Sequence, residues 1–330
     1  MVALRLTLAC GDYDRTKALE EGTVRPDGIE LTYLRLPVEE TFFRMLRYRE
    51  FEVAEMSLST YLVSLQYDPP PFVGLPVFPS RMFRHGSVYI NTDAGIDEPA
   101  DLRGKEVGVP EYQLSAGVWI RGILADHHGV PVDSVTYRTG GQESSGRIEK
   151  STLRLPDNIV VKPIGSTDTL SRQLATGEIA ALYTPRIPGP FAAGDPRVGR
   201  LFPDVVTAEK TYFAASGIFP IMHIVVLRRD VYESHPWVAQ SLYKAFARAK
   251  DEATERLYDS SALRYMLPWL IQHIEEARGL LGDDFWSYGL EANRETLATF
   301  LRYHHEQGLS AREIRPEELF APETTESFVI

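Results

Sequence analysis

The sequence predicts an α/β fold of two domains, each built on a small sheet that is covered by helices. The chain has 330 residues, about twice the usual length of a single domain. Strand-like and helix-like segments alternate over residues 4–65, which is typical of a mainly parallel sheet. A second α/β unit follows, and the chain then returns through an apolar strand to a helical C-terminal region. Together these observations predict a second domain inserted into the first.

The first unit opens with a strand whose alternating pattern runs into the turn residues Gly11 and Asp12. Pro37 precedes a helix-like segment, and Ser57 or Ser59 is expected to cap the helix that follows the third strand. The segment after the prolines at 69–71 is apolar enough for a buried or edge strand. The expected strands of this unit are 4–9, 29–34, 51–56, 72–78 and 87–91, and the expected helices are 14–20 and 39–49.

The second unit begins with a short helical turn and a strand over 96–110, followed by a helix over 114–128. Its further strands are expected at 135–137, 159–161 and 179–183, with a helix at 168–176. A returning strand is expected at 219–228, with helices at 232–258, 262–274 and 291–307. We therefore expect one domain of residues 1–91 and 219–330, a second domain of residues 92–218, and a two-strand hinge over an interdomain cleft.

The composition is that of an ordinary globular protein, with 44% hydrophobic and 11% aromatic residues. Lys and Arg number 35 against 46 Asp and Glu, so the net charge of −11 disfavours nucleic acid and anionic membranes as partners. Cys10 is the one cysteine, so no intramolecular disulfide can form. With no secretion signal and no apolar run long enough to span a bilayer, we expect a cytoplasmic protein. The sequence leaves the oligomeric state open, a homo-oligomer included.

Five strings occur in order along the chain: ACGDYDRT at 9–16, EMSLS at 55–59, PVFPSRMFRH at 76–85, GVPEYQ at 108–113 and GIFPIMH at 217–223. As an ordered set they resemble the 4,5-dihydroxyphthalate decarboxylase family, and the match extends from about residue 5 to Gln307-Gly308-Leu309. The resemblance implies a fold like that of type 2 periplasmic binding proteins. It also implies a cytoplasmic, cofactor-free carboxy-lyase that acts on a small aromatic carboxylate.

Polar residues of the first four strings, together with Ser115 and residues 183–186, follow expected strands. In open α/β sheets, ligands bind beyond the carboxyl ends of the strands, so we expect these residues to meet in the interdomain cleft. The groups concerned are Gly11-Asp12, Ser57 to Ser59, Arg81 to His85, Tyr112 to Ser115, and Tyr183 to Arg186.

Arg81, Arg84 and His85 form the densest cationic cluster in this acidic chain. An arginine fork donates two parallel hydrogen bonds to a carboxylate, so Arg81 and Arg84 are candidate anchors for a dicarboxylate substrate. The alternative for any single arginine is a solvated surface position or an ion pair with one of the many acids. On a strand Arg81 and Arg84 would point to opposite faces, so both reach one ligand only from a loop or a helical turn.

Decarboxylation of a hydroxylated aromatic acid needs a general acid that protonates the ring carbon bearing the carboxylate. His223, in an apolar strand at the expected hinge, is one candidate, and His85 is the other; the alternative for His223 is a buried core residue. Asp12 is a candidate hydrogen-bond partner for a substrate phenol. The candidate groups that bind and orient the substrate are Ser57, Ser59, Gln113, Ser115, Tyr183 and Arg186.

Motifs for metals and for phosphate-bearing cofactors are missing from the sequence. It contains no His-Glu-x-x-His, no cysteine cluster and no glycine-rich phosphate loop, so we expect neither a metal nor an organic cofactor. Trp237, Trp269 and Trp286 are expected to serve packing in the C-terminal helices. Two other functions remain open: a solute-binding protein for a small anion, and a related enzyme of the same scaffold that acts on another substrate.

Overall fold

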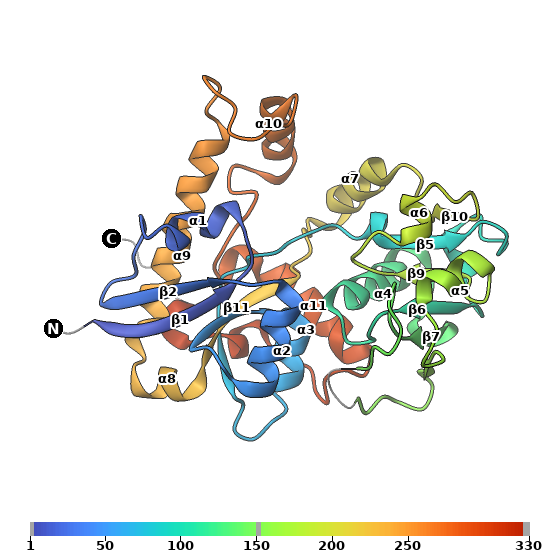
Figure 1. Cartoon of the computed structure of the whole chain (residues 1–330), viewed down its shortest axis with the longest axis horizontal. Helices are drawn as coiled ribbons and strands as arrows, with labels where there is room; N and C mark the ends of the chain where they lie inside the picture. Colours follow the sequence, from blue (N-terminus) through green and yellow to red (C-terminus); the bar gives the residue numbers. More distant parts are fainter. Residues whose placement is uncertain (1–2, 150–152, 326–330) are drawn as a thin grey trace. The chain divides into compact units, whose positions relative to one another are not determined.

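The computed structural model describes residues 3–149 and 153–325, which form two compact units (Figure 1). Unit 1 comprises the residues up to Arg81, His223–Arg294 and the residues from Arg315 onward. Unit 2 comprises Met82–Met222 and Glu295–Ile314. The expected domains of 1–91 with 219–330, and of 92–218, differ from these units at three places. Residues 82–91, residues 219–222 and residues 295–314, which include most of the last long helix, were expected in domain 1 and belong to unit 2.

Unit 1 is built on a five-stranded sheet in the order β2-β1-β3-β11-β4. The first three strands are parallel, because helices carry the chain back between them, and β11 runs antiparallel to both of its neighbours. The strands are β1 (Leu4–Cys10), β2 (Ile29–Arg35), β3 (Val53–Ser57), β4 (Phe72–Leu75) and β11 (His223–Arg228). The α-helices are α1 (Lys17–Glu20), α2 (Val38–Tyr48), α3 (Leu58–Ser64), α8 (Arg229–Ser234), α9 (Trp237–Leu257) and α10 (Leu270–Leu281). The 3₁₀ helices are η1 (Asp14–Thr16), η5 (Glu291–Asn293), η6 (Pro316–Leu319) and η7 (Pro322–Thr324).

The core of unit 1 lies on β3 and β11, whose interior residues are buried on both faces of the sheet. Both strands are central, with helix α2 packed against β3 and helix α3 against both β3 and β11. The expected strand at 72–78 is shorter, ends at Leu75 and forms an edge of the sheet. The returning strand also begins later than expected, at His223 rather than at Phe219.

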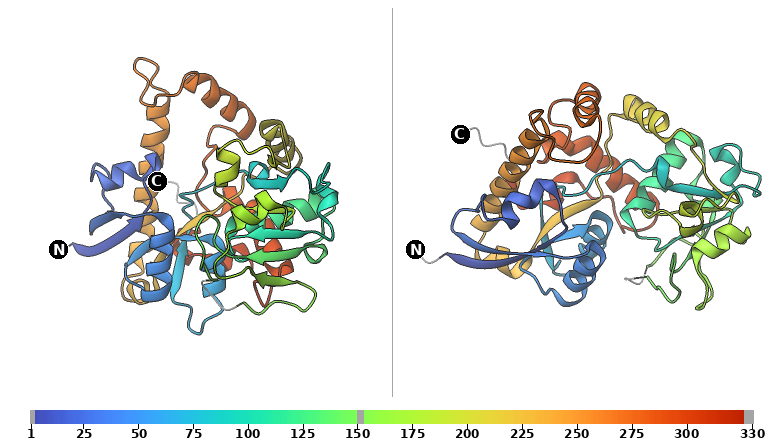
Figure 2. Two further views of the ribbon diagram at one scale, coloured as in Figure 1. Left: turned by 45° about the vertical axis from the view of Figure 1, so that its right-hand side comes forward. Right: turned by 45° about the horizontal axis from the view of Figure 1, so that its top comes forward.

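The C-terminal helices of unit 1 differ from the expectation at two points. The helix expected at 232–258 is broken into α8 and α9 at Pro236, which cannot continue a helix with its missing N–H. The helix expected at 262–274 begins only at Leu270, after Trp269 in a left-handed conformation with φ of 61°. Figure 2 shows α10 standing away from the sheet of unit 1 in both views.

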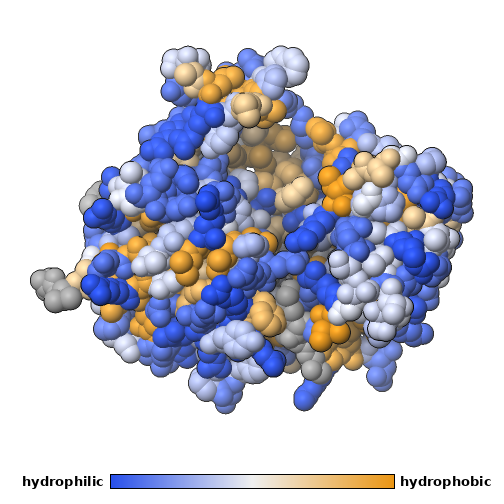
Figure 3. Space-filling view, in the orientation of Figure 1, coloured by the Kyte–Doolittle hydropathy of each residue, from blue (hydrophilic) through white to orange (hydrophobic). Residues whose placement is uncertain are grey.

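Two of the three tryptophans assigned to packing are largely exposed, which is a correction to that prediction. Trp269 is 73% exposed and Trp237 is 46% exposed. Trp286 donates its indole N–H to the Phe78 carbonyl at 3.0 Å. Met266 and Leu267, two apolar residues that precede α10, are also exposed. Figure 3 shows orange, hydrophobic surface in this region, at the top of the view.

Unit 2 is built on a six-stranded mixed sheet in the order β10-β5-β9-β6-β7-β8. A buried cluster of Tyr89, Leu170, Leu174, Ile179, Leu182 and Val198 packs helix α5 against this sheet. The strands are β5 (Val88–Asn91), β6 (Glu106–Val109), β7 (Thr136–Thr139), β8 (Val161–Pro163), β9 (Ala181–Tyr183) and β10 (Val198–Arg200). The α-helices are α4 (Ser115–His128), α5 (Leu170–Thr176), α6 (Gly189–Ala192), α7 (Val205–Ser216) and α11 (Arg294–Glu306). The 3₁₀ helices are η2 (His85–Ser87), η3 (Pro99–Leu102) and η4 (Val132–Ser134).

Helix α4 is the central helix of unit 2, with its residues from Ser115 to Leu124 all buried. It packs against α11, where the rings of Trp119 and Phe300 lie 5.2 Å apart. Gly122 allows this approach, because a Cβ there would lie only 2.1 Å from the Tyr303 ring. The close packing explains why α11 from Glu295 onward is part of this unit.

In the described part of the chain, no helix combines the length and the apolar character that crossing a bilayer requires.

Candidate functional site

The structure places the expected site residues in both units. Asp12, Ser57, Ser59, Arg81 and His223 belong to unit 1, and Arg84, His85, Gln113, Ser115, Tyr183 and Arg186 belong to unit 2. Each set is described within its own unit.

In unit 1, the pairing of β3 with β11 brings His223 beside an acidic residue. The antiparallel register sets His223 opposite Ser57 and Val225 opposite Glu55. Directly opposite side chains, and side chains two residues apart on one strand, point to the same face of a sheet. Glu55 and His223 therefore share a face, and the His223 Nδ1 lies 2.6 Å from a Glu55 carboxylate oxygen.

Glu55 is fully buried, with an exposed fraction of 0%, and several groups point their hydrogen atoms at it. Its Oε1 accepts the Tyr13 hydroxyl at 2.7 Å and faces the His223 Nδ1. Its Oε2 accepts the Gly11 backbone N–H at 2.9 Å and lies 3.5 Å from the Cys10 sulfur. The carboxylate thus collects donors from β1, from the loop after β1 and from β11.

These contacts decide the charge of Glu55. Burial by itself would raise the pKa of Glu55, but His223, the Tyr13 hydroxyl and the Gly11 N–H outweigh burial and hold that pKa below its usual value. Burial and the neighbouring Glu55 charge raise the pKa of the Tyr13 hydroxyl and of the Cys10 thiol, so both keep their protons. Glu55 is therefore an ionised acceptor surrounded by protonated donors.

The His223 ring is held on one side and open on the other. Phe42 packs edge-on against it with ring centroids 4.9 Å apart. The Nε2 atom has no hydrogen-bond partner among the described residues, and the side chain is 17% exposed. His223 is therefore not a fully buried core residue, which was the alternative to a catalytic role. Its Nε2 can exchange a proton with a bound molecule.

Sequence reasoning did not single out Glu55 as a site residue. One signal was available: a glutamate in the middle of an otherwise apolar strand is rarely buried unless it has a partner. The identity of that partner could not be predicted, because His223 lies 168 residues further along the chain.

In unit 2, Arg84 is a buried cation that forms no ion pair with any described residue. Its side chain is only 6% exposed, and among the described residues its hydrogen bonds go to the sulfur atoms of Met222 at 3.1 Å and Met82 at 3.6 Å. Burial lowers the pKa of Arg84 to about 10, with the charge of Glu209 acting in the opposite direction. Thioether sulfur is a weak acceptor, so the guanidinium keeps most of its capacity to bind a carboxylate.

Phe83, the residue before Arg84, packs in a cluster of aromatic rings in unit 2. Phe83 stacks on Phe219 with centroids 4.7 Å apart and an interplanar angle of 27°. Tyr212 and Phe213, both on α7, meet the Phe83 ring edge-on. Aromatic faces of this kind can stack on the ring of an aromatic carboxylate.

His85, the other candidate acid, has a different environment. It is 3% exposed, and its ring packs against Phe202 and Tyr212 at about 5 Å. Burial and the nearby His128 and His127 lower the pKa of His85 to about 4. His85 is therefore neutral near pH 7, which leaves it without the extra proton that a general acid delivers.

Gln113 follows β6 and directly precedes the N-terminal end of α4. The residue is 1% exposed, and neither its side-chain nitrogen nor its side-chain oxygen has a hydrogen-bond partner among the described residues. A buried amide without partners costs free energy unless a ligand or water satisfies it. Ser115, the first residue of α4, is also buried. This end of α4 remains a candidate ligand contact.

The remaining expected residues have other surroundings. The Arg81 guanidinium is buried and donates to the Ser287 carbonyl at 2.6 Å and to the Asn293 side chain. The carboxylate of Asp12 is 63% exposed and pairs with Arg35 at 3.2 Å; its expected role as a hydrogen-bond partner of a substrate phenol stays a prediction.

The serines, the tyrosine and the last arginine complete the set. Ser57 occupies the N-cap position of α3, but its side chain makes no capping hydrogen bond there, so the expected side-chain capping by this serine is wrong. Ser59 is buried in the first turn of the same helix. Tyr183 is buried at the end of β9, and burial raises the pKa of its hydroxyl, while Arg186 is exposed.

Comparisons with known proteins identify the family. A 4,5-dihydroxyphthalate decarboxylase of Comamonas testosteroni is 42% identical over 330 residues, which covers 100% of both chains. The chain belongs to the 4,5-dihydroxyphthalate decarboxylase family. A second 4,5-dihydroxyphthalate decarboxylase, of Pseudomonas putida, is 43% identical over 215 residues, covering 65% of this chain and 83% of the relative. No family model matches the sequence.

Solved structures confirm the fold expected for this family member. A periplasmic sulfonate-binding protein of Methylobacillus flagellatus aligns with a TM-score of 0.56 at 12% identity, covering 98% of this chain and 93% of its own. The alkanesulfonate-binding protein of Xanthomonas axonopodis pv. citri aligns with a TM-score of 0.51 at 12% identity, covering 98% of both chains. The family member thus has the α/β fold of type 2 periplasmic binding proteins.

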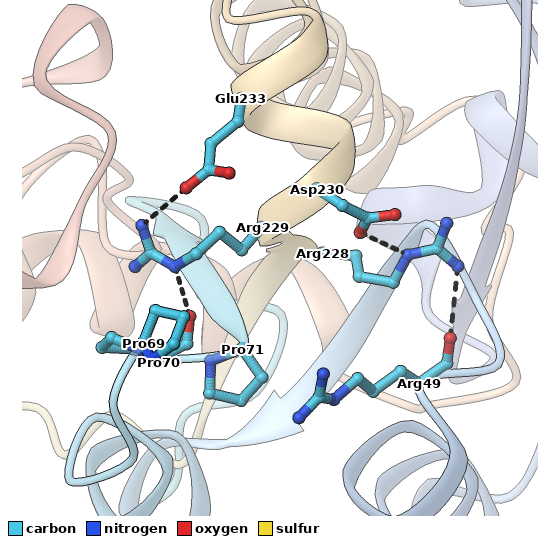
Figure 4. A pocket seen from close by; sticks show the side chains of 8 residues that line it. All are labelled: Arg49, Pro69, Pro70, Pro71, Arg228, Arg229, Asp230 and Glu233. Atoms are coloured by element: carbon cyan, nitrogen blue, oxygen red, sulfur yellow. Dashed lines mark hydrogen bonds and ion pairs between the residues drawn. The ribbon is translucent and has the colours of Figure 1, made fainter.

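A cavity of about 470 Å³ in unit 1 lies at the opposite end of β11 from His223 (Figure 4). Its arginines are partly satisfied from within the unit: Arg228 pairs with Asp230 at 2.6 Å, and Arg229 pairs with Glu233 at 3.6 Å. Arg228 lies five positions along the strand from His223, roughly 17 Å away, so this cavity is not part of the Glu55–His223 site. Within residues 3–149 and 153–325, no group of three or more His, Cys, Asp or Glu side chains is arranged to hold a metal ion.

Proposed function

We propose that this protein is a cofactor-independent decarboxylase of a hydroxylated aromatic dicarboxylate, and that it converts 4,5-dihydroxyphthalate to 3,4-dihydroxybenzoate and CO2. The name shared by both relatives supports the substrate class. The observation that carries the proposal is the Glu55–His223 pair, which leaves Nε2 of a partly exposed histidine open to a ligand. A protein that only binds its solute needs no such proton donor. The cytoplasmic location expected from the sequence remains part of this proposal.

The proposed reaction replaces a carboxylate on the ring with a proton. A hydroxyl para to the leaving carboxylate supplies electron density to the ring carbon that bears it. This carbon takes a proton from His223 Nε2, and the ring becomes a dienone-like intermediate. The bond to the carboxylate then breaks, CO2 leaves, and its bonding electron pair restores the aromatic ring. One proton is consumed for each CO2 released, and solvent returns it to His223.

Two further roles are proposed for residues of unit 2. Arg84 binds the carboxylate that the product retains, because a buried guanidinium that has no ion pair among the described residues gains the most from such a partner. Gln113 and Ser115 orient the substrate, and the buried Gln113 amide, which has no hydrogen-bond partner among the described residues, donates and accepts hydrogen bonds there. Arg81, Ser57, Ser59, Tyr183 and Arg186 remain candidate substrate contacts.

The test is CO2 release from a panel of hydroxylated benzoates and phthalates, with two variants measured beside the wild type. His223→Phe removes a proton that is delivered only as the ring carbon rehybridises, so turnover should fall by about a hundredfold or more with substrate binding nearly unchanged. Arg84→Met should mainly weaken binding, because the retained carboxylate is held in ground and transition states alike.

The outcomes separate the alternatives. If His223→Phe keeps full turnover and His85→Phe loses it, His85 is the acid. If both variants keep it, the histidine mechanism is wrong. Tight binding of these acids by the wild type with no CO2 release would make the protein a solute-binding protein, and release from a different ring acid would change the substrate.

A further inference from the structure

We infer that Glu55 is a positioning residue for His223: it keeps the proton on Nδ1, so that Nε2 is the nitrogen that delivers a proton to the substrate. This inference rests on the proposed function and extends it to a residue that does not touch the substrate. It concerns which ring nitrogen carries which hydrogen, a property that the partner of the other nitrogen decides.

The first argument is the count of donors around the carboxylate. An ionised carboxylate can only accept, and Glu55 faces the Gly11 N–H, the Tyr13 hydroxyl and the Cys10 thiol besides His223. The Gly11 N–H donates to Oε2 and the Tyr13 hydroxyl donates to Oε1, and these donors stabilise the ionised carboxylate, which carries no hydrogen on either oxygen. The 2.6 Å contact from Oε1 to Nδ1 is therefore a hydrogen bond that the histidine donates.

The second argument is charge. Glu55 is fully buried, and among the described residues His223 is its one ion-pair partner. A buried carboxylate is costly without a compensating positive charge, and an imidazolium ring, with a proton on each nitrogen, supplies one at 2.6 Å. In that form Nε2 carries the proton that is transferred, while the proton on Nδ1 stays in its hydrogen bond to Glu55.

The third argument is that the carboxylate itself is held rigidly. Gly11 lies under the Tyr13 ring so closely that a Cβ there would be 2.7 Å from a ring carbon. Its carbonyl accepts the Tyr33 hydroxyl at 2.7 Å, and that hydroxyl also lies 2.9 Å from the Thr16 hydroxyl. These contacts fix the turn whose N–H binds Glu55, and so they fix the direction in which Glu55 meets His223.

The test is Glu55→Gln, which keeps the size of the side chain and replaces one acceptor oxygen by an NH2 donor. Because the Gly11 N–H must be accepted, the amide oxygen should face Gly11 and the NH2 should face Tyr13 and His223. The Nδ1 atom must then accept, and the proton moves to Nε2 in a neutral ring. We expect turnover to fall by about a hundredfold or more, with the Kd for substrate within about threefold of wild type.

A spectroscopic measurement reads the tautomer directly. In ¹⁵N NMR spectra of the imidazole, His223 of the wild type should show a protonated Nδ1, and His223 of Glu55→Gln should show an unprotonated one. Glu52→Gln is the matched control: Glu52 also accepts a backbone N–H in this sheet, from Thr7 at 2.9 Å, but it does not contact His223. The control should keep the turnover and the His223 spectrum of the wild type.

Glu55→Gln with turnover within about threefold of wild type, or with Nδ1 still protonated, would overturn the inference. If this variant does not fold, Glu55→Asp keeps the charge but withdraws it by one methylene, and turnover should again fall with Kd retained; unchanged turnover overturns the inference there too. A wild type that releases no CO2 from any acid of the panel defeats the proposed function, and the NMR comparison then still decides whether Glu55 sets the tautomer.

Discussion

Replacing Arg84 by methionine should make the free protein more stable while it removes the response to substrate. Arg84 is buried, and its protein partners are two thioether sulfurs. Methionine has a similar length and adds a third thioether to this environment. The substitution therefore removes a desolvated charge without leaving a hydrogen-bond acceptor unsatisfied.

The size of the effect follows from the titration of Arg84. Burial lowers its pKa from the ordinary arginine value to about 10. A pKa lowered in the folded state means that the charged form costs stability at every pH below about 10, and that this cost is relieved only above it. At about 1.4 kcal/mol for each pKa unit, the cost at pH 7 is about 3 kcal/mol, so Arg84→Met should raise the free energy of unfolding by up to that amount.

The assay is urea unfolding at pH 7, with and without phthalate, a dicarboxylate that lacks the activating hydroxyl groups. Phthalate at 100 times its Kd should stabilise the wild type by about 2.7 kcal/mol and Arg84→Met by much less. Arg121→Met is the matched control in the same unit. Arg121 is equally buried but donates to the Gln307 side chain at 2.7 Å and to the Tyr112 carbonyl at 2.6 Å, so its loss should destabilise the protein by about 1–3 kcal/mol.

Two results would refute this reasoning. If Arg84→Met lowers the free energy of unfolding as Arg121→Met does, Arg84 is a structural residue and its burial does not destabilise the free protein. If phthalate stabilises Arg84→Met as strongly as the wild type, Arg84 does not bind the carboxylate.

Three other predictions concern metal dependence, pH and the core. Turnover should survive exhaustive dialysis against a chelator, because no set of metal ligands lies together in the described residues; loss of activity that an added metal restores would contradict this. The pKa of His85 is lowered to about 4, so between pH 6.5 and 4 the unfolded chain binds a proton that the folded protein does not bind. The free energy of unfolding therefore falls as the pH is lowered through this window. In urea titrations, the free energy of unfolding of His85→Leu should fall by about 2 kcal/mol less than that of the wild type when the pH is lowered from 6.5 to 4.5. Equal decreases in the two proteins would refute this prediction. Tyr61→Phe should cost about 1–3 kcal/mol in urea unfolding, because the buried hydroxyl accepts the Gly74 N–H at 2.9 Å and donates to the Leu319 carbonyl; an unchanged midpoint would show that water replaces it.

The amino-acid sequence by itself determined the fold class and most of the elements. Strand and helix periodicity depend on neighbouring residues, so β1, β3 and α4 were predicted close to their observed positions. The order of the five matched strings indicated the family, which the full-length relative confirms. The boundaries of the elements were less well determined. Pro236 is an example: the proline was visible in the sequence, but one helix was expected over 232–258 where the structure has two, α8 and α9.

Only the tertiary structure decided which polar side chains have partners. Glu55 and His223 meet because β11 pairs with β3, although His223 follows Glu55 by 168 residues in the chain. No local sequence pattern encodes the register of that pairing. Arg81 and Arg84 are three residues apart and looked equivalent, yet Arg81 donates to a carbonyl and an amide while Arg84 contacts only sulfur acceptors among its hydrogen-bond partners in the described chain. The physical reason is that burial and hydrogen bonding depend on long-range packing, whereas the periodicity that reveals strands and helices is local.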